Sequence, residues 1–319
     1  MSLAGFAPLP HPLNAEGKPR RVGVEIELGG ISEAGVARLC ADVLGGEAVQ
    51  RDSHIWAVKG SDIGDVEVYL DIFLRSATKT RLRDLALDLG REVVPVEIVT
   101  EPLLMDGLAR LDALREALRD AGALGSGAGL LFGFGVHFNI EVASEADADT
   151  VRPLLAYALI EDWLRASCPI DEARRLLPFT DPYPTEFVRA LIAAGLGATR
   201  SDLTGLYLAY TPSRNRGLDM LPLLAHFDPD RIAAAIEDKT SARPTFHFRL
   251  PDCRIDEGDW SLAGEWRRWV LVERVAGDSA LLRRLSDAWE DDHGLLTLSR
   301  QSWAARAGRI LQTAGLNGP

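Results

Sequence analysis

Two glutamates lie two residues apart in an otherwise apolar segment. Glu25 and Glu27 alternate with aliphatic residues within residues 21–29. In a β-strand, residues i and i+2 project from the same face, so the two carboxylates would share one side, about 6–7 Å apart. At an effective dielectric constant near 20, the two charges would repel each other by about 2–3 kcal/mol. The pair therefore predicts either a bound cation or an acidic face in contact with solvent.

Three further apolar segments carry polar side chains on one face only. They are His137, Asn139 and Glu141 within residues 135–142, Thr245, His247 and Arg249 within residues 243–250, and Glu97 within residues 93–99. If these segments are strands of one sheet, their polar faces can converge on a single site. An antiparallel sheet with one face in water shows the same alternation, so a solvated face is the alternative interpretation.

Together these side chains would form a set of carboxylate and imidazole ligands. The candidate metal ligands are Glu25, Glu27, Glu97 and His137, with His247 as a further member. Such a set suits Mg²⁺ or Mn²⁺ better than a metal that prefers thiolates. Arg249 beside the set would suit phosphate oxygens, which a guanidinium binds through two parallel hydrogen bonds. Taken singly, a hydrogen-bonded structural histidine and an ion-paired surface arginine are the ordinary alternatives.

Further arginines lie close to these segments along the chain. Arg214 and Arg216 belong to the turn-like segment 211–222, for which an anion-binding loop and a surface turn are equally good interpretations. Arg243 opens the last polar strand. With Arg249, these three complete the candidate catalytic arginines.

Two residues, again with Arg249, are candidates for binding a nucleotide. Asn139 lies on the polar face of its strand, and Lys59 follows the apolar segment 54–58. A solvated lysine is the simpler interpretation of Lys59. Glu67 and Asp71 share a strand face and could line an edge of the site, with a solvated face as the alternative.

The elements that would position these residues follow from periodicity and turn residues. Apolar alternation predicts strands near 20–28, 47–51, 54–58, 66–73, 95–100, 135–142 and 245–250. A period of 3.6 residues predicts helices near 32–44, 79–91, 106–121, 147–167, 185–194 and 220–226, and from residue 264 onward. Residues 169–184 are expected to form a loop. This mixture favours an α+β fold, with an antiparallel sheet covered by helices on one face.

The composition excludes several classes of protein. The chain has 319 residues, 47% hydrophobic and 26% charged, as in soluble globular proteins. Its net charge of −12 argues against nucleic-acid binding through phosphate contacts. No apolar run is long enough to span a bilayer. Residues 1–19, which we expect to be a flexible lead-in, lack the layout of a secretion signal. We therefore expect a cytoplasmic protein without a membrane partner.

Several familiar catalytic motifs are missing from the sequence. The glycine-rich stretch 125–129 follows a predicted helix and precedes a predicted strand, the reverse of a dinucleotide-binding or Walker loop. We interpret it as a connecting loop. There is no Gly-x-Ser-x-Gly elbow and no His-Glu-x-x-His zinc motif. The three cysteines are too far apart for a Cys-x-x-Cys metal site.

Four motifs, in this order, resemble the amidoligase family, part of the carboxylate–amine ligase superfamily of glutamine synthetase and glutamate–cysteine ligase. They are Gly-Val-Glu-Ile-Glu at 23–27, Pro-Val-Glu-Ile-Val-Thr-Glu-Pro at 95–102, Gly-Val-His-Phe-Asn at 135–139 and Thr-Phe-His-Phe-Arg-Leu at 245–250. The predicted helix at 265–275 also resembles that family. The resemblance implies a catalytic domain at 20–277, preceded by the lead-in 1–19 and followed by a helical extension, 278–319, packed on the same domain.

The resemblance also implies a glutamine-synthetase-like fold. Its sheet would be curved and mainly antiparallel, with helices on the outer face and an active site for ATP and Mg²⁺ on the concave face. By this similarity Glu25, Glu27 and Glu97 hold metal, His137 binds metal or phosphate, and Arg249 neutralises the transferring phosphoryl group. The chain departs from the family at His247, where a glutamate is usual. An imidazole still ligates a metal, but the exchange lowers the negative charge of the site by one, which could change metal preference, weaken binding or mark a lost activity.

The implied reaction is amide synthesis from a small-molecule or peptide carboxylate and an amine. ATP would phosphorylate the carboxylate, and the amine would then displace phosphate, while the protein positions the reactants and neutralises charge. Two alternatives stay open: a metal-dependent phosphotransferase or hydrolase, and a catalytically decayed nucleotide- or metal-binding protein. Because related ligases often build sites between subunits, a homo-oligomer is one of the expected states.

Overall fold

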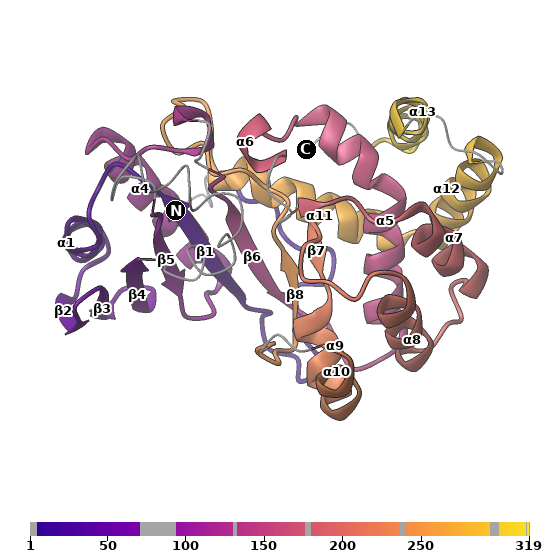
Figure 1. Cartoon of the computed structure of the whole chain (residues 1–319), viewed down its shortest axis with the longest axis horizontal. Coiled ribbons are helices and arrows are strands. Elements are labelled where there is room, and N and C mark those ends of the chain that lie inside the picture. Colours follow the sequence, from indigo (N-terminus) through magenta and orange to yellow (C-terminus); the bar gives the residue numbers. More distant parts are fainter. Residues whose placement is uncertain are drawn as a thin grey trace, which may run out of the picture.

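In the part of the chain that the structure describes, eight strands form one antiparallel sheet (Figure 1). This computed structural model describes residues 5–70, 94–129, 133–175, 180–236, 240–293, 300–316 and 318. The strand order is β2-β3-β4-β5-β1-β6-β8-β7. The strands are β1 (Val22–Leu28), β2 (Glu47–Asp52), β3 (Ile55–Ser61), β4 (Gly64–Leu70), β5 (Val96–Thr100), β6 (Val136–Glu141), β7 (Leu218–Asp219) and β8 (Thr245–Phe248). The order places β1, with its two glutamates, between β5 and β6.

Helices flank the sheet and continue beyond its β7 edge (Figure 1). They are α1 (Glu33–Leu44), α4 (Met105–Asp120), α5 (Ala148–Ser167), α6 (Glu172–Arg175), α7 (Thr185–Ala194), α8 (Arg200–Tyr210), α9 (Leu221–Phe227), α10 (Pro229–Ala235), α11 (Leu262–Gly277), α12 (Ser279–Asp292) and α13 (Arg300–Thr313), with a short 3₁₀ turn η2 (Ser126–Ala128).

The apolar face of the central strands packs against helices. The ring of Phe138 on β6 contacts Trp266 of α11, with ring centroids 5.7 Å apart. Phe246 and Phe248 on β8 both contact Trp269 of the same helix. Because side chains alternate across a strand, this packing leaves the intervening polar residues on the opposite face.

Helix α1 illustrates how local sequence sets the ends of these elements. The side chain of Ser32 accepts a hydrogen bond from the backbone N–H of Gly35 at 3.3 Å, which satisfies a donor that the helix leaves unpaired. The helix ends at Gly45, whose φ of 78° favours glycine. Helix α1 then packs on β3 and β4.

The segment before β1 contributes to the core. Phe6 and Leu9 are buried, and the backbone oxygen of Ala7 accepts a hydrogen bond from Trp266 of α11 at 2.8 Å. Over the residues that the structure describes, the expected lead-in therefore packs against the fold. Apolar side chains at its start account for this, because they gain more by burial than by exposure.

The α+β class and the antiparallel sheet are confirmed, and most predicted elements are present. The predicted helix at 79–91 and the end of the predicted strand 66–73, with Asp71, lie outside the described residues. The segment 169–184 is not entirely loop, since it contains α6, and the pattern analysis missed α8, α10 and β7. Among the described residues, no helix is both long and apolar enough to cross a membrane.

Candidate active site

Strand register brings the predicted polar residues together on one face. Glu27 of β1 lies opposite Glu97 of β5. On the other side of β1, Glu25 lies opposite His137 of β6. The next pair along β6 is Asn139 with His247 of β8. Residues more than two hundred positions apart thus form one continuous polar cluster.

Glu27, Glu97 and His137 form the first group that could hold a metal ion. One ligand atom from each lies within 4.8 Å of the others, and all three residues are buried, with 8%, 8% and 5% of their surface exposed. The carboxylate of Glu27 accepts a hydrogen bond from the N–H of Gly135 at 2.7 Å. Two acids so close and so buried are costly unless a positive charge or further hydrogen bonds compensate.

Glu25, His137 and His247 form a second such group. The two oxygens of Glu25 lie 2.8 Å from Nδ1 of His137 and 2.8 Å from Nδ2 of Asn139, with Nη1 of Arg243 at 3.5 Å. Burial raises the pKa of this carboxyl. The hydrogen bond from His137 and the electrostatic effect of His247, His137 and Arg243 more than offset burial and hold the pKa well below its ordinary value. Glu25 is therefore ionised near neutral pH.

His247 lies deepest in the cluster. Its Nδ1 is 2.8 Å from Oδ1 of Asn139, and its ring meets the ring of His137 edge-on, with centroids 5.1 Å apart. Burial holds the pKa of His247 well below its ordinary value, against the attraction of Glu25. A neutral imidazole is the form that binds a metal.

Arg249 follows β8 directly and supplies positive charge beside the acids. Its backbone N–H donates to the oxygen of Gly217 at 2.9 Å, and its side chain donates to the backbone oxygen of Arg214 at 3.2 Å. Burial lowers the pKa of Arg249, while the carboxylates of Asp219 and Glu27 raise it. A guanidinium stays charged in proteins, so Arg249 is a fixed cation within electrostatic reach of Glu27.

Asp219, at the end of β7, is a site residue that the pattern analysis missed. It is fully buried, and one of its carboxylate oxygens lies 3.3 Å from Nε of Arg214. Burial raises its pKa, while Arg214 and Arg249 lower it. The only signal in the sequence is an isolated acid in the apolar run 218–224.

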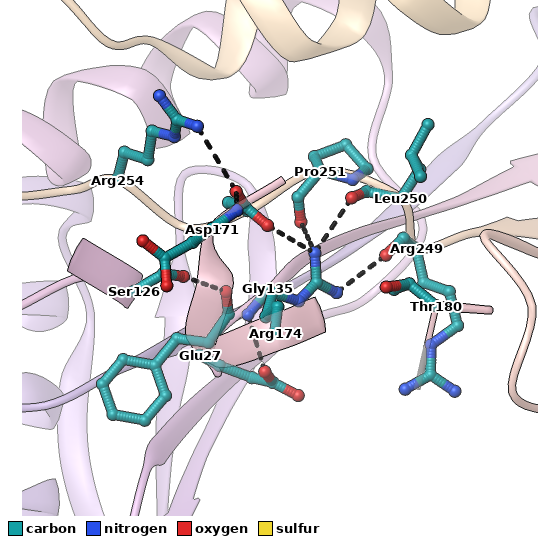
Figure 2. A network of polar contacts seen from close by, with 12 residues as sticks. Glu27, Ser126, Gly135, Asp171, Arg174, Thr180, Arg249, Leu250, Pro251 and Arg254 are labelled. Atoms are coloured by element: carbon teal, nitrogen blue, oxygen red, sulfur yellow. Dashed lines mark hydrogen bonds and ion pairs between the residues drawn. The ribbon is translucent and has the colours of Figure 1, made fainter. Parts of the chain in front are cut away.

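A second missed residue, Arg174 of α6, fixes the chain that follows β8 (Figure 2). Its guanidinium donates to the backbone oxygens of Arg249, Leu250 and Pro251 at 2.7–2.9 Å and lies 3.1 Å from a carboxylate oxygen of Asp252. Arg174 is only 2% exposed. It therefore holds the backbone of Arg249 in place, and nothing in the local sequence signals this role.

Not every predicted site residue joins the cluster. The guanidinium of Arg216 donates to Oγ1 of Thr211 at 2.6 Å and to the backbone oxygen of Pro182 at 2.8 Å, which ties the loop together. Lys59 is exposed on β3, three strands from β1, where it forms an ion pair with Asp65. Asn139 lies inside the cluster, with its two amide atoms directed at Glu25 and His247.

The arrangement fits a divalent cation. Nε2 of His137 is buried without a hydrogen-bond partner, and its distance to the nearer carboxylate oxygen of Glu27 is 3.8 Å. An imidazole nitrogen facing two carboxylates is the kind of donor set that holds a divalent ion such as Mn²⁺ or Mg²⁺. Such a set leaves positions for substrate oxygens.

Comparison with known proteins places the chain in a family. A family model described as "putative amidoligase enzyme" matches residues 18–271, which include every residue of the polar cluster. No curated protein and no solved structure matches the chain. The matched range covers well over half of the 319 residues. The chain belongs to the amidoligase family.

Proposed function

We propose that this protein is an ATP-dependent carboxylate–amine ligase that forms an amide through an acyl phosphate. One observation carries the proposal: in a chain of the amidoligase family, Glu27, Glu97 and His137 converge on one buried face beside Arg249. We also propose that the sheet is the glutamine-synthetase-like one, with this polar face as the substrate side.

The cluster supplies the charge pattern that phosphoryl transfer requires. Mg²⁺ or Mn²⁺, held by Glu27, Glu97 and His137, would neutralise negative charge on the phosphates of ATP. Arg249 would bind the oxygens of the transferring phosphoryl group, because a guanidinium matches their geometry. Buried, preorganised charges act strongly because no water must be rearranged during the reaction.

The proposed reaction has two steps, phosphorylation of the acid and then formation of the amide. A carboxylate oxygen of the acid attacks the γ-phosphorus, the bond from that phosphorus to the β–γ bridging oxygen breaks, and ADP leaves. The amine nitrogen then attacks the acyl carbon, the carbon–oxygen bond to phosphate breaks, and the nitrogen loses a proton. Proximity supplies much of the acceleration in both steps, since the residues hold the reactants together.

The other arginines have separate roles in this proposal. Arg214, partly exposed and held by Asp219, and Arg243, partly exposed beside Glu25, would attract the anionic ends of the substrates. Arg216 would shape the loop that carries Arg214. We propose a small-molecule or peptide carboxylate and an amine as substrates, and the cytoplasm as the location.

The test is ADP release in the presence of Mg²⁺, measured over a panel of carboxylates and amines. The proposal requires that release depends on both a carboxylate and an amine, and that Glu27→Gln lowers it by about 10²-fold or more without loss of fold. ATP consumption that needs no amine would overturn the proposal in favour of a phosphotransferase or hydrolase. Failure to bind ATP with Mg²⁺ would overturn it in favour of a decayed binding protein.

A further inference from the structure

Glu25 lies at the centre of a chain of hydrogen bonds that includes both histidines of the cluster. One of its oxygens is 2.8 Å from Nδ1 of His137. The other is 2.8 Å from Nδ2 of Asn139, whose Oδ1 is in turn 2.8 Å from Nδ1 of His247. Arg243 approaches the same carboxylate at 3.5 Å. The chain thus runs from one imidazole to the other through Glu25 and Asn139.

The direction of these hydrogen bonds follows from chemistry alone. An ionised carboxylate only accepts, so His137 must donate from Nδ1 and Asn139 must turn its NH₂ group toward Glu25. The oxygen of Asn139 then faces His247 and also only accepts, so His247 donates from Nδ1 as well. In its neutral form an imidazole carries one N–H, which leaves Nε2 of both rings with a lone pair.

The unprotonated nitrogen of His137, Nε2, lies on the side of Glu27 and Glu97 and not on the side of Glu25. Nε2 of His137 is buried, lacks a hydrogen-bond partner and lies 3.8 Å from a carboxylate oxygen of Glu27. Glu27, Glu97 and His137 each offer one ligand atom within 4.8 Å of the others, and Nε2 is the nitrogen of His137 that lies near Glu27. An ion bound between Glu25 and His137 would instead meet the Nδ1 hydrogen, and would have to break the 2.8 Å hydrogen bond that joins the two side chains.

We propose that Glu25 is a positioning residue and not an ion ligand: it fixes His137 and His247 as Nδ1–H tautomers, so that a divalent ion binds to Glu27, Glu97 and Nε2 of His137. Metal-binding histidines commonly donate their other ring N–H to a carboxylate, which sets the tautomer and the orientation of the ring. The inference deepens the proposed function by dividing its ligand set, but it concerns ion binding and needs no turnover.

The first test reads the tautomers in the metal-free protein. Long-range ¹H–¹⁵N correlation spectra of protein labelled with ¹⁵N-histidine distinguish Nδ1–H from Nε2–H for each ring. We expect Nδ1–H at His137 and at His247. In Glu25→Gln, the new amide has only one acceptor oxygen for its two neighbours, His137 and Asn139, and its NH₂ group must donate to the other. If the NH₂ group donates to His137, that ring must change to Nε2–H. If it donates to Asn139, the amide of Asn139 must turn over, and the ring of His247 must then change to Nε2–H. Glu141→Gln is the same exchange on β6 but outside this chain of hydrogen bonds, so it should change neither ring.

The second test measures Mn²⁺ binding by electron paramagnetic resonance, with folding checked by circular dichroism. We expect one ion per chain in the wild type, more than about 100-fold weaker binding in Glu27→Gln, and binding weaker by only about 10–100-fold in Glu25→Gln. Asn139→Ala should release the tautomer of His247 while Mn²⁺ affinity stays within a few-fold. If Glu25→Gln fails to fold, the tautomer and Mn²⁺ affinity measured on Asn139→Ala still test the inference.

Three results would overturn the inference. They are an Nε2–H tautomer at His137 in the wild type, two ions per chain of which Glu25→Gln removes one, and loss of Mn²⁺ binding in Asn139→Ala. Because neither test uses ATP, a protein that passes both but releases no ADP would refute the ligase and leave the ion site intact.

Discussion

The outer strands of the sheet (β2, β3 and β4) and its central strands (β5, β1, β6 and β8) alternate polar and apolar residues in the same way. They differ in how far the polar side chains are exposed to solvent. On β4, Glu67 is exposed, whereas Glu27 on β1 is 8% exposed. Lys59 and Asp65 pair at the surface, where solvent screens their charges and the pair contributes little to stability. Burying an unmatched acid costs several kcal/mol, so burial, and not alternation, separates the site from a solvated face.

The largest difference between the two regions should appear when one arginine side chain is removed from each. Arg249→Ala should lower amine-dependent ADP release by about 10³-fold or more, because a guanidinium that stabilises the transferring phosphoryl group contributes on this scale. Arg51→Ala, on exposed β2, should leave the rate unchanged. Steady-state kinetics of both variants checks this, and equal rates for the two would break the comparison.

Arg174→Met tests whether the central region depends on its buried guanidinium. The exchange removes the donor to Oδ1 of Asp252 and to the backbone oxygens of Arg249 and Leu250. It also removes one of the two donors to the backbone oxygen of Pro251, so the free energy of unfolding should fall by about 3–5 kcal/mol. Denaturant titration measures this loss. A variant as stable as the wild type would show that the network does not hold the end of β8.

An isosteric exchange of one acid in each region isolates charge from shape. Glu27→Gln should lower the rate of ADP release by about 10²–10³-fold, as expected when one preorganised electrostatic contact is lost. Glu67→Gln, two strands away on the same face, is the matched control and should stay within about twofold of the wild type. Comparable losses in both variants would mean that the polar face acts as a whole and has no defined centre.

Gly135→Ala tests how tightly the central cluster is assembled. A methyl group there would lie 2.6 Å from Nη2 of Arg174 and 3.0 Å from Nε2 of His137. Because the backbone contacts of Arg174 restrain it, we expect His137 to shift and the rate to fall by up to about 10²-fold, with Mn²⁺ affinity reduced in parallel. Unchanged Mn²⁺ affinity would argue that His137 does not bind the ion.

The smallest effect should come from the outer strands. Lys59→Met removes an exposed ion pair, so the free energy of unfolding should change very little and the rate of ADP release should not change. Thermal unfolding and the ADP assay measure the two quantities. A large loss of rate would instead support Lys59 as a nucleotide-binding residue.

The sequence was sufficient to predict the strands of the site and the face on which each polar residue lies. Alternation is a local property, so Glu25, Glu27, His137 and His247 could be assigned to one side before any contact was known. Strand order is not local. The sequence alone therefore left Lys59 open both as a phosphate-binding residue and as a solvated lysine, and only the sheet shows that two strands separate it from β1.

The supporting residues could not be predicted for a different reason. Arg174 acts on backbone oxygens about 75 residues further along the chain, and such contacts leave no pattern around either partner. Asp219 is defined by its complete burial, which depends on packing and not on its neighbours in the sequence. One chain reveals which faces are polar, but the partners that hold those faces in place emerge only in three dimensions.

Anomalous diffraction from a crystal soaked with Mn²⁺ tests the central claim most directly. We expect a peak within coordination distance of Glu27, Glu97 and Nε2 of His137, on the side of the sheet that Arg249 faces. A peak elsewhere on the chain, or none at this cluster under saturating Mn²⁺, would contradict it.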